Sequence, residues 1–176
     1  MRRLIISIGL RGRETTPMAG LIISVKKSIE HAQPDEIIFV VSRESKQFPL
    51  PSIIERLGMQ SYEAKSGYRV IELEDAGDLG KCHTQLFPKF EEVTQGCDYL
   101  VVDATSGTKV MCSLLVLYSV LFGADELVYV AGKRSGGVVL SGVEQVYSVD
   151  PTFLKKGPST PAPEKCTSGE SAPKEL

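Results

Sequence analysis

Runs of apolar residues alternate along the chain with segments that have the hydrophobic spacing of helices. Runs that are apolar throughout predict strands buried on both faces, because a strand with one solvent face alternates apolar and polar positions. The predicted buried strands cover residues 4–10, 36–42, 98–103 and 126–131. A further run alternates in polarity, which predicts a strand near the sheet edge at residues 68–73. The predicted helices cover residues 16–33, 52–59, 78–95 and 108–123.

Three details of the pattern make separate predictions. Pro88 lies inside the helix predicted for residues 78–95, where proline removes a backbone hydrogen bond and is expected to bend or split the helix. Residues 45–51 have no helical or strand period and are predicted to form a loop. Two short runs near the end of the ordered pattern, residues 137–140 and 145–149, predict a hairpin.

Strands that alternate with helices of this length form βαβ units with parallel strands. The sequence therefore predicts an α/β fold, a doubly wound, mostly parallel, Rossmann-like sheet with a C-terminal β-hairpin. We expect this domain to cover residues 1–154. Residues 155–176 are rich in Pro, Ser, Lys and Glu and almost lack apolar residues, which predicts a disordered tail.

Composition narrows the classes of partner. The chain has 176 residues, enough for one domain with its own core, and a formal net charge of −2. Proteins that bind duplex nucleic acid usually carry a basic excess, so no duplex partner is expected. The four cysteines contain no C-x-x-C pair and neither histidine has metal-ligand spacing, so we expect reduced cysteines, no metal and no cofactor. No apolar stretch has the length of a membrane span or signal peptide, which predicts a cytoplasmic protein without membrane contact.

The loop after the strand at 98–103 has the composition of an anion site. Residues 103–109 read Asp-Ala-Thr-Ser-Gly-Thr-Lys and precede the most apolar helix. Gly107 lets a ligand approach the backbone, and the N–H groups of a first helical turn attract anions. Ser106 and Thr108 add hydroxyl groups, and Lys109 adds a positive charge. The loop has neither the Walker A spacing nor a G-x-G-x-x-G spacing, and the structural alternative is a capped helix with a solvated lysine.

Other loops are expected at the same edge of the sheet. In a common strand order the first and fourth strands are neighbours, and ligands bind beyond their carboxyl ends. The loop after the first strand contains glycines, threonines and arginines, and arginine binds phosphates or stacks on bases. The structural alternatives are a solvated surface loop and, near residue 133, a hairpin turn. The candidate ligand-binding residues are Gly9, Leu10, Arg11, Thr15, Thr16, Ser42, Arg43, Asp103, Thr105, Gly107 and Lys133.

Residues 103–111, which read DATSGTKVM, resemble the D-x-T-G-G-T-K-x-M signature of CARF domains, the CRISPR-associated Rossmann fold. Ser106 stands in the place of the first glycine of that signature. Residues 3–150 also resemble the family in architecture. The resemblance implies binding of a cyclic oligoadenylate, most often the four- or six-membered ring, in type III CRISPR antiviral defence. It also implies a homodimer with one ring across the two-fold axis, which doubles the positive pocket without a basic chain.

The resemblance leaves two activities open. In a stand-alone ring nuclease, a ribose 2′-OH attacks the adjacent phosphate without metal and leaves a 2′,3′-cyclic phosphate. Lys109 would stabilise the developing charge, and Ser106 and Thr108 would orient the reacting groups. In a non-catalytic sensor subunit, a partner would supply the output, because the sequence carries no effector motif.

Three functions outside this family are also compatible with parts of the sequence. A generic nucleotide-binding Rossmann module fits the same loop. A receiver-type signalling domain would use Asp103, Thr105 and Lys133, but the acidic pair that holds its magnesium is absent after the first strand. A PD…E-x-K nuclease would use Asp35 and Glu63, but these residues are not predicted to lie on adjacent strands.

Overall fold

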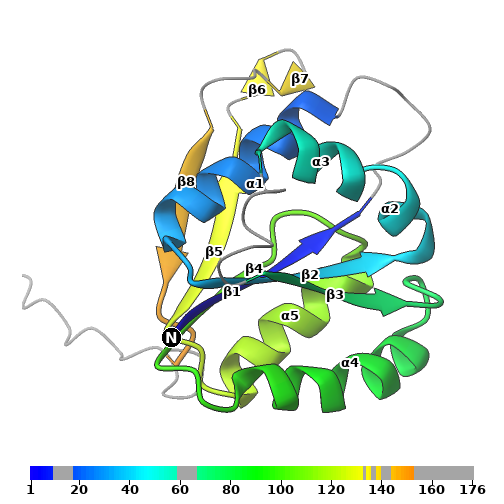
Figure 1. Ribbon diagram of the computed structural model, residues 1–176, viewed down its shortest axis with the longest axis vertical. Coiled ribbons are helices and arrows are strands. Elements are labelled where there is room, and N and C mark those ends of the chain that lie inside the picture. Colours follow the sequence, from blue (N-terminus) through cyan, green and yellow to red (C-terminus); the bar gives the residue numbers. More distant parts are fainter. Residues whose placement is uncertain (10–17, 59–66, 133, 136–137, 140–143, 153–176) are drawn as a thin grey trace, which may run out of the picture.

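The apolar runs form one six-stranded sheet in the computed structural model, which describes residues 1–9, 18–58, 67–132, 134–135, 138–139 and 144–152 (Figure 1). The strand order is β3-β2-β1-β4-β5-β8, with β8 antiparallel to β5 and all other neighbours parallel. This order confirms the mostly parallel α/β fold and places the first strand beside the fourth. The strands are β1 (Arg2–Ile8), β2 (Glu36–Ser42), β3 (Tyr68–Leu73), β4 (Tyr99–Asp103), β5 (Glu126–Ala131) and β8 (Gln145–Val149).

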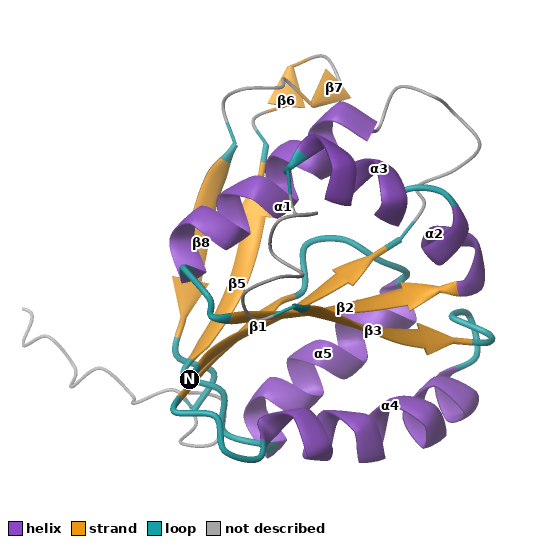
Figure 2. Cartoon of the chain, in the orientation of Figure 1, coloured by secondary structure: helices purple, strands orange, loops and turns teal. Residues whose placement is uncertain are grey.

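Helices cover both faces of the sheet (Figure 2). The helices α1 and α3 lie on one face, and α4 and α5 lie on the other. Every central strand is therefore covered on both sides, which explains why its sequence is apolar throughout. The helices are α1 (Met18–Ala32), α2 (Arg43–Gln47), α3 (Leu50–Arg56), α4 (Leu79–Thr94) and α5 (Lys109–Leu121).

The alternation of side chains along each strand divides the interior into two apolar cores. On β1, Ile5 packs toward α4 and α5, whereas Leu4 and Ile6 pack toward α1 and α3. Tyr118 is fully buried at the centre of the first core, where its ring lies 5.2 Å from that of Phe90, centroid to centroid. These two cores fix the sheet and therefore the positions at which its strands end.

Two predicted boundaries differ from the structure. The first strand ends at Ile8 rather than at residue 10. Residues 45–51 were predicted to form a loop, but most of them belong to α2 and to the start of α3. The helix α2 begins there because the Ser42 hydroxyl caps it, accepting a hydrogen bond from the Ser45 N–H at 3.2 Å. A five-residue helix is too short to show a hydrophobic period.

The predicted pairing of residues 137–140 with residues 145–149 is wrong. The strand β8 pairs with β5, whereas β7 (Val138–Val139) pairs with β6 (Arg134–Ser135) in a separate two-stranded sheet. A two-residue period identifies a strand but does not identify its partner. Pro88 does not split α4, which continues through it. Pro88 is exposed, so water can hydrate the backbone carbonyl in the preceding helical turn, which receives no hydrogen bond from proline.

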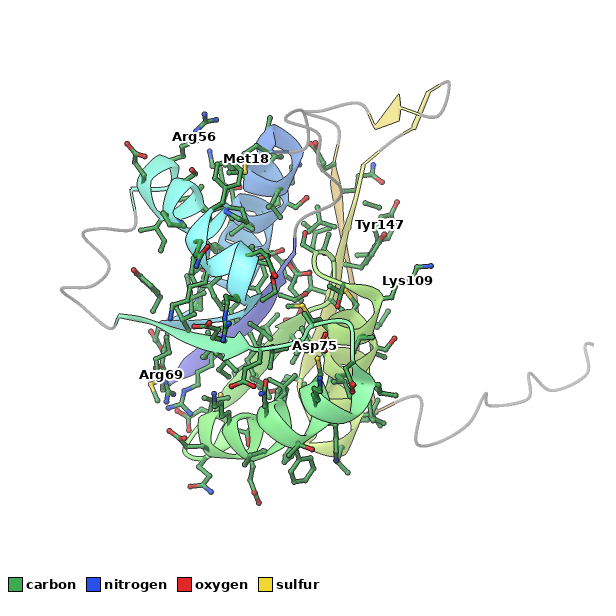
Figure 3. All side chains as sticks on the ribbon, turned by 90° about the vertical axis from the view of Figure 1, so that its right-hand side faces the viewer. Met18, Arg56, Arg69, Asp75, Lys109 and Tyr147 are labelled. Atoms are coloured by element: carbon green, nitrogen blue, oxygen red, sulfur yellow. The ribbon has the colours of Figure 1, made fainter. Side chains whose placement is uncertain are left out.

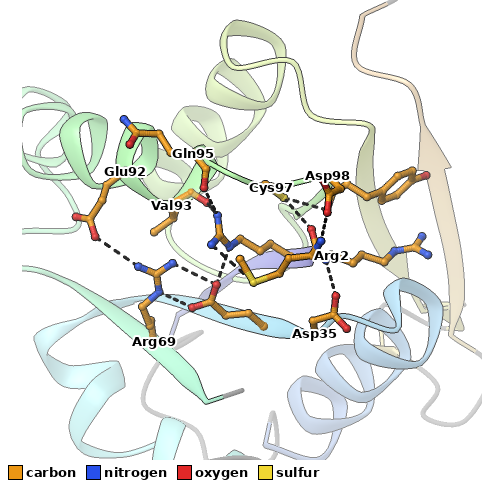
Figure 4. A network of polar contacts seen from close by, with 12 residues as sticks. Arg2, Asp35, Arg69, Glu92, Val93, Gln95, Cys97 and Asp98 are labelled. Carbon is orange, nitrogen blue, oxygen red and sulfur yellow. Dashed lines mark hydrogen bonds and ion pairs between the residues drawn. The ribbon is translucent and has the colours of Figure 1, made fainter. Parts of the chain in front are cut away.

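Buried ion pairs join the strands at the amino-terminal edge of the sheet (Figure 4). Arg3 on β1 donates from Nε to Glu36 at 2.6 Å, and from Nη1 to the carbonyls of Val93 and Gln95, each at 2.7 Å. Arg69 on β3 lies 2.6 Å from the second Glu36 oxygen. Burial alone would raise the pKa of Glu36, but hydrogen bonds from Arg69 and Arg3 outweigh it and hold that pKa below its usual value. The charges at this edge are therefore engaged in holding the fold together.

The sequence also makes predictions about membrane spans and about the end of the domain. No helix among the described residues is both long and apolar enough to cross a bilayer. The domain end at residue 154 and the predicted tail of residues 155–176 lie outside the described residues.

Candidate functional site

The loops after β1 and β4 meet at the carboxyl-terminal edge of the sheet. These strands are parallel neighbours, with Ile6 opposite Asp103, so both chains leave the sheet at nearly the same level. Gly9 follows β1, and a Cβ placed on it would lie 2.4 Å from the Cα of Gly107. The backbones of the two loops are therefore in direct contact, which only glycine allows. This contact lies at the point where the strand order reverses, the usual ligand site of such sheets.

Ser7 and Gly107 fix the shape of the β4–α5 loop, residues 104–108. The Ser7 hydroxyl, on β1, donates a hydrogen bond to the carbonyl of Ser106. Gly107 has a φ of +130°, and a Cβ on it would lie 2.9 Å from the Ser7 oxygen. A residue with a side chain would be strained in this conformation and would collide with Ser7. The hydrogen bond thus holds the loop against β1, and the lack of a side chain on Gly107 allows the close approach.

The β4–α5 loop ends in a capped helix start. The Thr108 hydroxyl accepts from the Met111 N–H at 3.2 Å and donates to the carbonyl of Ala76 at 2.5 Å. Thr108 was predicted to act as a donor toward a ligand, but its proton is used within the protein. Its structural effect is to fix the amino-terminal end of α5, where free N–H groups and the helix dipole favour an anion.

Three kinds of group remain available to a ligand at this end of α5. The backbone N–H groups of residues 107–110 have no acceptor within the described part of the chain. The Ser106 side chain is half-buried and its hydroxyl has no hydrogen-bond partner among the described residues. Lys109 is exposed, makes no ion pair with a described residue, and extends away from the helix in Figure 3. Together they supply hydrogen-bond donors and one positive charge, a combination suited to phosphate.

Asp103 lies beneath the loop and is fully buried. One carboxylate oxygen accepts from the Thr105 N–H at 2.6 Å, and the other accepts from the hydroxyl of Ser28 on α1. The Thr105 hydroxyl in turn accepts from the Val130 N–H at 2.7 Å. Burial raises the pKa of Asp103, although hydrogen bonds from Ser28 and Thr105 oppose the shift. Direct contact of Asp103 or Thr105 with a ligand stays a prediction, and their present contacts hold the loop to α1 and β5.

We expect the Asp103→Asn variant to be as stable as the wild type at low pH and more stable at pH 8. An asparagine can accept from the Thr105 N–H and donate to Ser28, whose hydroxyl lies 3.1 Å from the carbonyl of Ser24. In the wild type, burial disfavours the carboxylate, so stability is lost as the pH rises from 3.8 through the raised pKa of Asp103. The neutral variant lacks that loss. Urea denaturation at pH 3.5 and pH 8 should show a gain of up to about 1 kcal/mol at the higher pH.

The matched comparison for this experiment is Asp103→Ala. Alanine leaves the buried Thr105 N–H without its acceptor, which should lower the free energy of unfolding by about 2 kcal/mol. Equal destabilisation by asparagine and alanine would contradict a role that requires only hydrogen-bond acceptance.

Comparison with known proteins finds solved structures of similar fold. No protein-family model and no curated protein matches the sequence. Solved structures of similar fold include Enterococcus italicus Csm6 bound to cyclic hexa-2′-fluoro-hexa-dAMP, with 15% sequence identity and a TM-score of 0.48. The match covers 74% of this chain and 33% of the Csm6 chain, so this chain spans about a third of that protein.

The structure describes some of the remaining predicted ligand residues but not others. The Ser42 hydroxyl caps α2 and also donates to the Ser45 hydroxyl at 3.1 Å. Arg43 is exposed, and its Nε lies 3.7 Å from Glu72. Ser42 ends β2 and Arg43 follows it, so both lie at the same edge as the β4–α5 loop, although among the described residues no hydrogen bond or ion pair joins them to it. The predicted site residues outside the described part of the chain are Leu10, Arg11, Thr15, Thr16 and Lys133.

Neither histidine takes part in the described contacts between the loops after β1 and β4. The Nδ1 atom of His83 is 2.6 Å from the Tyr118 hydroxyl, between α4 and α5. His31 pairs with Glu126 at 2.7 Å near the amino-terminal edge, where hydrogen bonds from Ser148, Tyr99 and His31 outweigh burial and lower the pKa of Glu126 to about 2. Among the described residues, no group of three or more His, Cys, Asp or Glu side chains could hold a metal ion.

Two supporting residues were missed as members of the site. Ser7 stands in an otherwise apolar strand end, and Ser28 is fully buried on the face of α1 that also carries Val25 and Ala32. A hydroxyl residue in a fully apolar position needs a hydrogen-bond partner, and this is the signal that could have identified both. The partner itself depends on how α1 packs on the sheet.

Proposed function

We propose that this protein binds a cyclic oligoadenylate, most favourably cyclic tetra-adenylate, at the end of β1 and β4. The observation that supports this most is the contact between Gly9 and Gly107 beneath the start of α5. It leaves the open N–H groups and the half-buried Ser106 hydroxyl beside Lys109, the exposed first residue of α5. A phosphodiester fits these donors, and residues 103–111 resemble the CARF signature.

We further propose that the bound ring is cleaved without a metal. The 2′-oxygen of one ribose attacks the neighbouring phosphorus, the bond from phosphorus to the 5′-oxygen breaks, and a 2′,3′-cyclic phosphate forms. The 2′-hydroxyl proton passes to water and the departing 5′-oxygen takes a proton from water. Lys109 stabilises the charge on the phosphoryl oxygens, and Ser106 orients the reacting ribose. Thr108 acts by fixing the helix end, because its hydroxyl is engaged by Ala76.

The proposed assembly is a homodimer in the cytoplasm. A cyclic oligoadenylate with an even number of nucleotides can have two-fold symmetry, so two copies of one site can bind opposite phosphates. A chain with a net charge of −2 can then place two lysines around one ring without carrying a basic surface overall. The alternative within the same ligand class is a sensor subunit that binds the ring uncut and acts through a partner.

The test is a cleavage assay with chelator present. The protein is incubated with cyclic tetra-adenylate or cyclic hexa-adenylate in EDTA, and products are separated by liquid chromatography with mass detection. We expect linear fragments that end in 2′,3′-cyclic phosphate. A ring that binds in calorimetry but stays intact would favour the sensor subunit. Binding of ATP or NAD with no binding of either ring would refute the proposed ligand and favour a general nucleotide-binding module.

A further inference from the structure

A carboxyl group is buried beneath the proposed anion site, where its described hydrogen-bond partners are all uncharged. Asp103 is fully buried, and one of its oxygens accepts from the Thr105 N–H of the β4–α5 loop at 2.6 Å. The other oxygen accepts from the hydroxyl of Ser28 on α1. Burial raises the pKa of Asp103, and only these uncharged donors oppose the rise. Such surroundings favour the protonated form of the carboxyl group.

The charged and titratable groups on the surrounding elements are engaged elsewhere. On α1, the ammonium group of Lys27 donates to the backbone carbonyl of Glu144. On α5, Lys109 is exposed, and the Cys112 thiol donates to the carbonyl of Ser106 at 3.6 Å. The other charged residues and the histidine of α1, β1 and β5 each form an ion pair with a group other than Asp103, and they are Arg2, Arg3, Lys26, Glu30, His31 and Glu126.

The structure can accommodate a proton on Asp103 without losing a hydrogen bond. The Ser28 hydroxyl lies 3.1 Å from the carbonyl of Ser24, so it can donate there and accept the proton of Asp103. The bond from the Thr105 N–H to the other carboxyl oxygen is available in both protonation states. The β4–α5 loop can therefore keep its shape while Asp103 changes its charge.

We propose that an anion bound at the β4–α5 loop and a proton on Asp103 stabilise each other, so that the site takes up a proton when it binds the ring. Each phosphodiester of the ring carries a negative charge, which repels an ionised Asp103 through the poorly solvated interior beneath the loop. Protonation removes this repulsion and leaves the donors of the loop in place. Asp103 is thus a positioning residue, because it acts on the ring through the loop and needs no contact with it.

The coupling predicts tighter binding at lower pH. Binding that favours the protonated form is strongest below the pKa that Asp103 has in the free protein, and it weakens as the pH rises through the higher pKa of the bound protein. By linkage, the ratio of the two limiting affinities for the anion equals the ratio of the two affinities for the proton, and a coupling of ordinary size makes it at least about fivefold. Its application to the ring rests on the proposed function, whereas the coupling to a bound anion rests on the burial and hydrogen bonds of Asp103.

The test measures ring affinity by calorimetry in a series from pH 5 to pH 9 on the wild type, Asp103→Asn and Asp125→Asn. The probe is 2′-fluoro cyclic tetra-adenylate, which has no 2′-hydroxyl to attack its phosphates. Asp125→Asn is the matched control, because Asp125 also accepts a backbone N–H, that of Leu100 at 2.7 Å, at the opposite edge of the sheet. We expect the ratio of the affinities at the two ends of the series to be at least about fivefold larger for the wild type and the control than for Asp103→Asn. Titration of the ring or of other residues affects all three proteins alike.

The outcomes separate this inference from the proposed function. If the wild type and Asp103→Asn bind the ring with the same pH dependence, the coupling is overturned and ring binding stands. If the ring binds at no pH, the proposed ligand is refuted and sulfate becomes the probe. The carboxyl carbon-13 signal of Asp103, assigned by its loss in Asp103→Asn, should then titrate at a higher pH when sulfate is added, and an unchanged titration would overturn the coupling.

A misfolded Asp103→Asn variant, detected by circular dichroism, leaves a measurement on the wild type alone. Calorimetry of ring binding in two buffers of different ionisation enthalpy counts the protons taken up at each pH. Net uptake that rises and falls across the series supports the coupling, and no uptake at any pH overturns it.

Discussion

Replacing Lys109 by alanine is expected to weaken binding of cyclic tetra-adenylate at least about 30-fold, which corresponds to about 2 kcal/mol. The lysine supplies the full positive charge on the β4–α5 side of the site, next to N–H groups that carry only partial charge. In the proposed homodimer a two-fold ring would contact both copies, so one substitution would remove two ammonium groups. Cleavage should fall by at least the same factor, because the charge on the phosphorus oxygens grows in the transition state.

Stability measurements separate this effect from unfolding. Lys109 is exposed and makes no ion pair with a described residue, so the midpoint of thermal unfolding should stay unchanged. Lys89→Ala is the matched control, because Lys89 is exposed on α4 and not at the carboxyl-terminal loops. Calorimetry on the three proteins measures the affinities. Retention of wild-type affinity by Lys109→Ala would remove the ammonium group from the proposed site.

The Gly9→Ala substitution is expected to damage both the fold and the ligand site. Its Cβ would lie 2.4 Å from the Cα and 2.7 Å from the carbonyl carbon of Gly107. Gly107 cannot move aside freely, because Ser7 donates a hydrogen bond to the carbonyl of the preceding residue, Ser106. The two loops must separate, which should lower the free energy of unfolding by about 3 kcal/mol. Displacing the start of α5 by this amount should also reduce ring affinity at least about tenfold.

The matched control for that experiment is Gly20→Ala. A Cβ on Gly20 meets no atom within 4 Å, and the residue lies in α1. Alanine should therefore stabilise the helix by about 0.5–1 kcal/mol and leave ring binding as it is. Urea denaturation and calorimetry on both variants measure the two effects. Gly9→Ala with wild-type stability would mean that the β1 and β4 loops do not touch in solution.

Much of the fold followed from the sequence because each strand and helix signal is local. Continuous apolar runs identified β1, β2, β4 and β5, and the alternating run at residues 68–73 correctly identified an edge strand. The contact between the loops after β1 and β4 followed from the common strand order of such sheets. The pairing of β8 could not be predicted in this way, because a strand pattern of five residues fits any open edge.

The sequence predicted which loops meet at the candidate site, but it did not predict which hydroxyl groups there bond within the protein. Ser106 and Thr108 have the same chemistry in the sequence, yet only Thr108 meets a carbonyl, that of Ala76 from the segment before α4. Contact of Asp103 with a ligand stays a prediction, and the sequence did not indicate that its buried carboxylate accepts a hydrogen bond from Ser28. Each of these outcomes depends on contacts between distant segments, which local patterns do not encode.

The direction of β8 determines where anything attached to this domain is tethered. Because β8 runs antiparallel to β5, it begins at the edge that carries the ligand loops and ends with Val149 opposite Leu127, near the start of β5. The described chain therefore leaves the sheet on the side of Arg3 and Glu36, far from Lys109. A fluorophore or reporter module joined directly after residue 152, in place of residues 153–176, would start at the edge opposite the ligand loops. A signal from an occupied site would then have to cross the length of the sheet to reach the point of attachment.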